Sequence, residues 1–286
     1  MAKCNVCFRK CEIGEGKLGF CGARTCMQGQ VAQANYGKIT SLALDPIEKK
    51  PLSRFYPGSL ILSAGSYGCN LRCPFCQNYE ISWSEEAWRF AETSDVITPE
   101  ELAQTAAYYG DRGNIGIAFT YNEPLIGYEY ILDTAKLISA MGMKTVLVTN
   151  GTASLPILDQ LAPYTDAMNI DLKGFTDRYY RDVLKGDRRM VMDFIEKAVQ
   201  ICHVELTTLI IPGENDSETE MEELSSWVSG LKNADGEVIG DRIPLHISRF
   251  FPRFRMQDRD ATDVGLIYRL AEVAGRRLKY VYTGNC

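Results

Sequence analysis

From residue 60 onward, the sequence repeats one pattern, a short apolar run followed by a longer segment with helical periodicity. Six apolar runs occur, at residues 60–64, 115–119, 144–148, 167–171, 203–211 and 244–248. The segments between them carry helix-start signals, as at Thr98-Pro99-Glu100-Glu101, where Thr98 is a good N-cap and Glu101 completes a capping box. A βα unit repeated in this way predicts a parallel sheet, either in a partial or full (β/α) barrel or in a doubly wound open sheet.

The residues before this repeat are organised differently. Apolar runs at 31–34 and 39–44 flank Asn35-Tyr36-Gly37-Lys38, which predicts a β-hairpin, and Pro46 and Pro51 then interrupt regular structure. We therefore expect three parts. They are a Cys-rich metal-binding module at 1–30, a hairpin and linker at 31–57, and a barrel at 58–286.

Composition restricts the class of protein further. The formal net charge is −6, which argues against a protein that binds nucleic-acid backbones nonspecifically. No apolar run approaches the roughly 20 residues of a membrane span, and the N-terminus lacks an apolar leader. We expect a monomeric cytoplasmic protein whose ten cysteines are reduced thiols, and clustered thiols in such a compartment favour metal binding.

Three cysteines directly follow the first apolar run of the repeat. Cys69, Cys73 and Cys76 have the spacing C-x3-C-x2-C, with Phe75 beside the last of them. A [4Fe-4S] cluster is normally held by four cysteine thiolates. Three thiolates would bind three of its irons and leave the fourth iron with an open position for a ligand. The alternatives are a three-cysteine zinc site completed by a distant residue, or unliganded thiols.

The segment Gly68-Cys-Asn-Leu-Arg-Cys-Pro-Phe-Cys-Gln-Asn78 resembles the cluster loop of the radical S-adenosylmethionine (SAM) enzymes. The resemblance runs from about residue 58 to 282. It is closest to the branch of pyruvate formate-lyase-activating enzyme and, over the whole chain, to the radical SAM proteins of the AmmeMemoRadiSam system. It implies a [4Fe-4S] cluster that binds and reductively cleaves SAM, a 5′-deoxyadenosyl radical that abstracts hydrogen, oxygen sensitivity, and a ferredoxin or flavodoxin as electron donor. We predict a (β/α)6 partial TIM barrel.

In a barrel, the active site lies at the carboxyl ends of the strands. Glu123, Asn150, Asp171, Lys173 and His246 end or follow apolar runs and offer partners for an ammonium, hydroxyls and a carboxylate. Taken singly, an Asp-x-Lys pair is more often a salt bridge and a lone His a structural hydrogen bonder.

By resemblance, residues 120–124 stand where the family has a Gly-Gly-Glu-type motif for the SAM amino group, with Tyr121-Asn122 in place of the two glycines. Asp171, Lys173 and His246 match positions around the SAM carboxylate and a monovalent cation, although Val148 replaces an acidic residue there. The expected cofactor-binding residues are Phe75, Asn122, Glu123, Asn150, Asp171, Lys173 and His246.

A second group of cysteines lies in the first 26 residues. Cys4, Cys7, Cys11 and Cys21 can form a four-thiolate site, and Cys26 is an apparent extra when compared with the resembling proteins. The segment is too short to fold on a core of its own, so a metal would stabilise it. The spacing alone does not separate a zinc ion from a second [4Fe-4S] cluster, and unliganded thiols are the third alternative.

The substrate is open at this level. The resemblance favours a partner polypeptide, as for a glycyl-radical activase, with RNA or a small metabolite as alternatives. A protein of another class, which binds zinc or iron–sulfur or transfers electrons without SAM chemistry, also fits the cysteines. The segment 249–255, RFFPRFR, would lie beside the barrel mouth, either to contact a substrate or to pack its Phe residues under the barrel.

Overall fold

The computed structural model describes the backbone of all 286 residues and the side chains of all of them except Ala91. Its centre is an eight-stranded sheet in the order β12-β11-β10-β9-β8-β7-β6-β5. The strands are β5 (Ile39–Pro46), β6 (Leu60–Ser66), β7 (Asn114–Phe119), β8 (Lys144–Thr149), β9 (Ala167–Asp171), β10 (His203–Ile210), β11 (Leu245–Arg249) and β12 (Val281–Gly284). β5 is antiparallel to β6, and all other neighbours are parallel.

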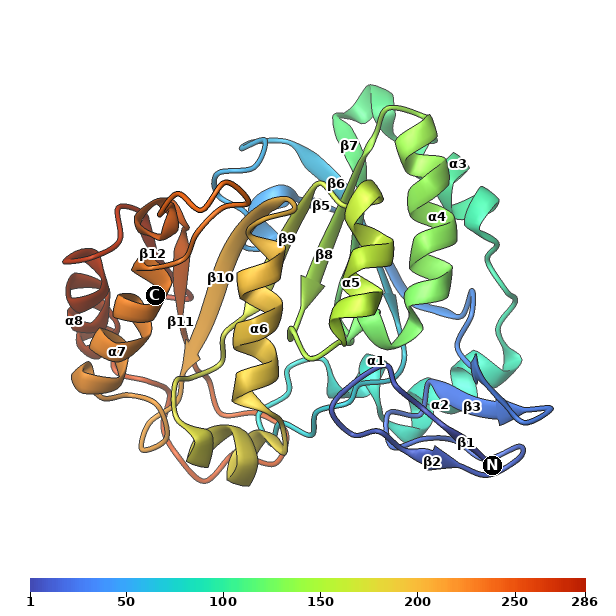
Figure 1. Cartoon of the computed structure of the whole chain (residues 1–286), viewed down its shortest axis with the longest axis horizontal. Coiled ribbons are helices and arrows are strands. Elements are labelled where there is room, and N and C mark those ends of the chain that lie inside the picture. The colour runs from blue at the N-terminus through green and yellow to red at the C-terminus, as the bar shows by residue number, and fades with distance from the viewer.

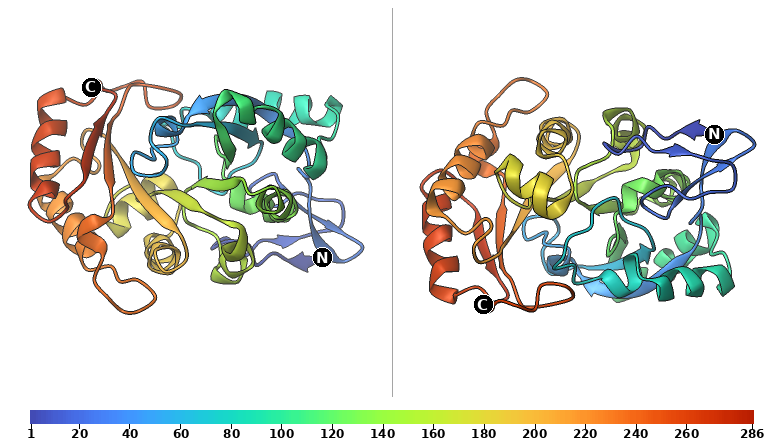
Figure 2. Two further views of the ribbon diagram at one scale, coloured as in Figure 1. Left: turned by 90° about the horizontal axis from the view of Figure 1, so that it is seen from above. Right: turned by 90° about the horizontal axis from the view of Figure 1, so that it is seen from below.

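Helices connect the parallel strands and cover the outer side of the curved sheet (Figures 1 and 2). They are α1 (Tyr79–Ser82), α2 (Glu85–Thr93), α3 (Pro99–Tyr108), α4 (Tyr128–Ala140), α5 (Leu155–Leu161), α6 (Arg188–Ala198), α7 (Glu218–Ser229) and α8 (Val264–Gly275), with a π-helical turn at Tyr179–Leu184. β5 and β12 are the two edges of the sheet, so the barrel stays open between them. The prediction of a (β/α)6 partial barrel is confirmed: its six strands are β6 to β11, and β12 extends the sheet.

The helix starts follow local chemistry. At α3, the Thr98 hydroxyl accepts from the Glu101 amide at 3.2 Å and the Glu101 carboxylate accepts from the Thr98 amide at 2.8 Å, which completes the predicted capping box. At α7, Ser217 caps the Glu220 amide, but the Glu220 carboxylate accepts from the Phe175 amide instead. At α7, a tertiary hydrogen bond has therefore replaced the carboxylate half of a capping box.

The hairpin predicted for residues 31–44 is wrong. β4 (Gln30–Gln33) does not pair with β5. It forms an antiparallel pair with the preceding strand β3 (Arg24–Met27), whereas β5 pairs with β6 over most of its length. The intervening Asn35 does not close a turn between them, because its side-chain amide donates to the Ser66 hydroxyl and the Tyr67 carbonyl after β6. The chain therefore passes from the N-terminal module to the sheet edge at this point.

The N-terminal module lies at the end of the barrel where the parallel strands terminate (Figure 1). It contains β1 (Ala2–Lys3), β2 (Glu12–Ile13), β3 and β4. The Ser154 amide, after β8, donates to the Val6 carbonyl at 2.8 Å. The backbones of Cys7 and Ala153 form an isolated antiparallel β-bridge. Val6 and Ile13 belong to the same buried apolar cluster as the barrel core, so the module packs on the barrel. The boundaries proposed at residues 30 and 57 stay a prediction.

In the part of the chain with described residues, no helix is both long and apolar enough to cross a membrane.

Candidate active site

A cavity of about 730 Å³ opens where the parallel strands end. The walls come from the loops after β6, β7, β8 and β9, from β10 and β11, and from the segment after β5. Every cofactor-site residue expected from the barrel sequence lines it, namely Cys69, Cys73, Phe75, Cys76, Asn122, Glu123, Asn150, Asp171, Lys173 and His246. A single cavity thus collects side chains that are up to 177 positions apart, from Cys69 to His246.

The cysteine loop leaves β6 through Gly68, which has φ +98°. A Cβ atom there would lie 2.7 Å from the Ala23 side chain and 3.0 Å from the Cys21 carbonyl oxygen. The Gly68 amide donates to the Ser82 carbonyl, and the Cys69 amide donates to the Cys21 carbonyl at 3.2 Å. Only glycine permits both this backbone conformation and this close approach of the N-terminal module.

The triad thiols lie on the cavity wall in a low-dielectric setting. Burial raises the pKa of Cys69 well above its usual value, with a further contribution from Glu123, and burial raises the pKa of Cys73 to about 12 although Lys173 opposes it. Among the described residues, no three Cys, His, Asp or Glu side chains converge closely enough to hold one metal ion. A cubane does not require that convergence, because each thiolate binds a different iron. The three-thiol donor set fits three corners of such a cluster.

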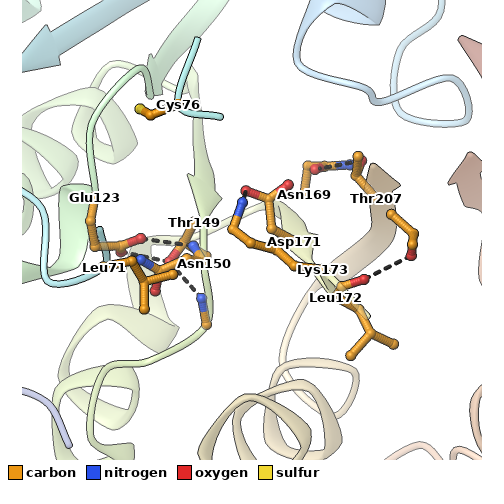
Figure 3. Close-up of polar contacts among 12 residues, drawn as sticks. Leu71, Cys76, Glu123, Thr149, Asn150, Asn169, Asp171, Leu172, Lys173 and Thr207 are labelled. Carbon is orange, nitrogen blue, oxygen red and sulfur yellow. Dashed lines mark hydrogen bonds and ion pairs between the residues drawn. The ribbon is translucent and has the colours of Figure 1, made fainter. Parts of the chain in front are cut away.

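Glu123 follows β7 and is almost completely buried, at 2% exposure. One carboxylate oxygen accepts from the Thr149 hydroxyl at 2.6 Å and the Leu125 amide at 3.1 Å, and the other accepts from the Asn150 amide at 2.7 Å (Figure 3). Burial raises the pKa of Glu123 to about 7 despite these bonds. A carboxylate has about four lone-pair sites, so one acceptor site remains for a ligand.

Two asparagines connect neighbouring loops to the cysteine loop. The Asn122 side-chain amide donates to the Tyr67 and Gly68 carbonyls, and its oxygen accepts from the Ser66 amide. The side-chain amide nitrogen of Asn150 donates to the side-chain oxygen of Asn70 at 3.0 Å and lies 4.0 Å from the Cys69 sulfur. Both residues therefore hold the loop in place.

Lys173 and Asp171 form an ion pair at 2.8 Å beside the Glu123 group (Figure 3). Burial works against the charge on Lys173, but Asp171 and Cys73 outweigh it and raise the lysine pKa above its usual value. Lys173 is therefore a fixed cation on the cavity wall. The salt bridge that the Asp-x-Lys spacing allowed is present, and both residues still line the cavity.

The expectation that His246 ends its strand is wrong, because it is the second residue of β11 and lines the cavity from within the sheet. It bonds a carboxylate that the sequence reasoning missed. Its Nε2 lies 2.6 Å from Oε2 of Glu205, whose other oxygen lies 2.9 Å from Nε2 of His203. The amides of Ser53 and Arg54 also donate to Glu205. Burial opposes ionisation of Glu205, but these donors outweigh it and lower its pKa to about 2. The sequence did contain a signal, namely a single acidic residue inside an apolar run, two positions after His203.

Tyr121 is a second cavity residue that sequence reasoning did not select. It has φ +73°, a conformation that is strained for an aromatic residue. Its hydroxyl donates to Asp45 at 2.8 Å, and the buried Lys50 ammonium binds the same carboxylate at 2.8 Å. The signal was its place in the motif, because the resemblance implies glycine at this position and a motif glycine often marks a positive φ.

The segment 249–255 packs partly as its apolar residues suggested. Phe250 is buried, at 1% exposure, and Phe254 stacks on Tyr79 with ring centres 4.2 Å apart. The Arg255 amide donates to the Pro74 carbonyl at 2.9 Å, so the segment braces the cysteine loop. Phe251 is 43% exposed.

The four N-terminal cysteines named above line a second cavity, next to the cysteine loop. They are Cys4, Cys7, Cys11 and Cys21. Burial raises the pKa of Cys7 to about 11 and also raises the pKa of Cys21. Cys26 is outside this cavity, and its thiol donates to Glu15 at 3.5 Å.

Comparison with known proteins identifies the family. Residues 64–224, more than half of the chain, match the model of the radical SAM superfamily. The chain belongs to that superfamily. Over 286 residues it is 37% identical to the uncharacterized protein MJ0808 of Methanocaldococcus jannaschii, which covers 99% of this chain and 81% of that protein. It is 26% identical over 172 residues to the pyruvate formate-lyase-activating enzyme of Clostridium pasteurianum, covering 59% and 69% of the two chains.

Solved structures show the same fold. A radical SAM methyltransferase from Sphaerobacter thermophilus matches 80% of this chain and 67% of its own with a TM-score of 0.56 and 18% identity. SuiB of Streptococcus suis, solved with the precursor peptide SuiA, matches 76% of this chain and 46% of its own with a TM-score of 0.56 and 13% identity. Membership of the superfamily implies a [4Fe-4S] cluster and SAM, and an enzyme that cleaves SAM with that cluster.

Proposed function

We propose that this protein is a radical SAM oxidoreductase that acts on a partner polypeptide. Cys69, Cys73 and Cys76 would hold the [4Fe-4S] cluster, and the open iron would bind SAM. When bound, the cluster would supply one electron to cleave the sulfonium bond of SAM, which would give methionine and a 5′-deoxyadenosyl radical able to take a hydrogen atom from the substrate. The observation that carries the proposal is the single cavity that all ten expected residues line.

The charged residues of the cavity complement the two ends of the SAM amino-acid moiety. Glu123 has one acceptor site left for the ammonium group, and Lys173 is a partly buried cation suited to the carboxylate. His246 is held at the same cavity by Glu205. Asn150 and Phe75 line the wall beside the triad. These side chains position the cofactor, and we assign none of them a proton-transfer step.

The preference for a polypeptide substrate rests on the relatives. The Clostridium pasteurianum protein is named for activating another enzyme, pyruvate formate-lyase, and SuiB was solved with a precursor peptide. The proposal also requires a low-potential one-electron donor, a ferredoxin or flavodoxin, and protection from oxygen. We place the protein in the reducing cytoplasm, because its clustered thiols must remain reduced to bind iron. We also expect it to be a monomer.

The substrate class can be tested by following hydrogen into the product. The anaerobically reconstituted enzyme is incubated with SAM, reductant and fractions of a uniformly deuterated cell extract, separated into protein, RNA and small molecules. Mass spectrometry then measures deuterium in 5′-deoxyadenosine. We expect label only with the protein fraction, and protease treatment should remove it. Label from RNA or from small molecules would contradict the proposed substrate, and a loaded enzyme that forms no 5′-deoxyadenosine would contradict the proposed chemistry.

A further inference from the structure

The cavity of the N-terminal module is a second potential metal site. Its four cysteines come from three segments of the module, at residues 4–7, 11 and 21, and the polar side chains of Arg9, Arg24 and Asn70 also line it, together with apolar residues. Four thiolates are a complete ligand set for a closed site, with no position left for a substrate. Such a site is suited to stability or to electron transfer.

Arg24 indicates that this cavity accommodates an anion. The side chain is 4% exposed, and its two terminal nitrogens bind Glu129 at 2.6 and 2.7 Å. Its Nε is buried and finds no hydrogen-bond partner among the described residues. Buried N–H groups normally have an acceptor. Sulfur atoms of a negatively charged metal–thiolate centre would provide one.

The four thiols are not gathered around one point, as a bound zinc ion would require, and this wider arrangement is compatible with an iron–sulfur cluster. A tetrahedral zinc ion with Zn–S bonds of about 2.3 Å brings its four sulfur atoms to one point. In the described part of the chain, no three Cys, His, Asp or Glu side chains converge in that way. The triad at Cys69, Cys73 and Cys76 shows the same behaviour, and the superfamily places a cubane there. Both sets of thiols therefore line a cavity without meeting at a single-ion position.

The two thiol sites are in direct contact. The Cys69 amide donates to the Cys21 carbonyl at 3.2 Å, which joins one ligand of each site through a single hydrogen bond. Asn70, next to Cys69, lines the N-terminal cavity together with Cys7. Electron transfer through protein weakens steeply with distance, so this contact provides a short route between the sites.

We propose that the four N-terminal cysteines hold a second [4Fe-4S] cluster that relays electrons to the triad cluster. This inference rests on the proposed function, because the triad cluster is the acceptor. One electron passes from a low-potential iron–sulfur or flavin protein to the N-terminal cluster, which changes from the 2+ to the 1+ state. It returns to 2+ when the triad cluster is reduced in turn. No atom or proton moves in this step.

Metal content and EPR test the cluster itself. The anaerobically reconstituted full chain should contain about eight iron atoms and no stoichiometric zinc, and a variant with all three triad cysteines changed to Ala should keep about four. After dithionite reduction, that variant should show an EPR signal that SAM does not alter. Cys7→Ala should keep about four iron atoms with a SAM-sensitive signal, and the matched control Cys26→Ala about eight. One zinc per chain, with no iron in the triad variant, would overturn the proposal.

The relay is tested by rates of reduction. Flavodoxin in its fully reduced form is mixed with oxidised protein, and freeze-quench EPR follows the SAM-sensitive signal of the triad cluster. We expect this signal to form much more slowly in Cys7→Ala than in wild type, and at the wild-type rate in Cys26→Ala. Equal rates in wild type and Cys7→Ala would overturn the relay.

Failure of the relay and failure of the proposed function give different results. If wild type with both clusters cleaves no SAM, the proposed function is wrong while the SAM-insensitive signal remains. If wild type cleaves SAM and the N-terminal site holds zinc, this inference alone is wrong. Should Cys7→Ala not fold, as judged by circular dichroism, Arg24→Met provides the second variant. This variant loses a buried cation, so the reduction potential of the cluster that gives the SAM-insensitive signal should fall. An unchanged reduction potential would contradict the placement of that cluster beside Arg24.

Discussion

At the scale of single residues, Glu123 connects fold and chemistry. It is buried, it accepts three hydrogen bonds from protein groups, and it lines the cavity with the triad. Its raised pKa of about 7 means that its charge changes near physiological pH. In the range between the usual value of 4.5 and about 7, the folded protein binds a proton that the unfolded chain has released. Ionising Glu123 therefore lowers folding stability as pH rises through this range.

SAM binding should show the opposite dependence on pH. The ammonium group of SAM pairs with the ionised form of Glu123, so affinity should rise with pH as the carboxyl loses its proton. With a pKa of about 7, the dissociation constant should fall roughly eightfold from pH 6 to pH 7.5. Glu123→Gln should weaken binding and remove this dependence. Equilibrium dialysis with the cluster-loaded protein measures both, and an unchanged pH profile in Glu123→Gln would contradict the role.

Glu205 is expected to matter for stability as well as for position. Its carboxylate is completely buried and is bound by two histidines and two backbone amides. Glu205→Gln leaves some of these donors without an acceptor and should lower the free energy of unfolding by about 3 kcal/mol. The control is Glu222→Gln, which removes an exposed ion pair with Arg276 and should have little effect. Urea unfolding measures the two variants, and equal midpoints would contradict the expectation.

At the scale of elements, the carboxyl ends of the parallel strands explain why much of the site was predictable. Parallel strands all end on the same side, so Glu123, Asn150 and Lys173 had to approach one another once the strands were recognised. Residues whose role depends on non-local pairing were not predictable in this way. Glu205 was missed because three of its four partners, His246 and the amides of Ser53 and Arg54, come from distant segments. The hairpin prediction failed because Asn35 bonds the end of β6 and the loop after it.

Gly68 is the point where the element β6, the cysteine loop and the N-terminal module meet. Gly68→Ala combines strain at φ +98° with overlap against Ala23 and the Cys21 carbonyl, and should destabilise the protein by about 2–4 kcal/mol. Gly142→Ala is the matched control, because Gly142 has φ +71° with no atom within 4 Å of a new Cβ, and should cost about 1 kcal/mol. Thermal unfolding compares them. A loss in Gly68→Ala no greater than in Gly142→Ala would show that close docking is unimportant.

At the scale of the whole molecule, an open barrel and a small module share one end. The barrel places the triad and the charged residues around one cavity, and the module packs against the outside of the same cysteine loop (Figure 1). The segment after β5 begins at the other end of the barrel, because β5 is antiparallel to β6 and Pro46 pairs with Leu60 at the start of β6, and its Ser53 and Arg54 amides bind Glu205. This arrangement leaves the cluster loop supported from both sides, which suits a site that must exclude water and oxygen during radical chemistry.

The central claim is that the triad holds the cluster that cleaves SAM. The most direct measurement is 5′-deoxyadenosine formed from SAM by the anaerobically reconstituted protein with dithionite, quantified by mass spectrometry. Wild type should form it, and so should Cys202→Ala, which changes a partly buried thiol directly before β10 that does not line the triad cavity. Cys73→Ala should form none. Formation of 5′-deoxyadenosine by Cys73→Ala at the wild-type level, or none by wild type with a full iron complement, would contradict the account.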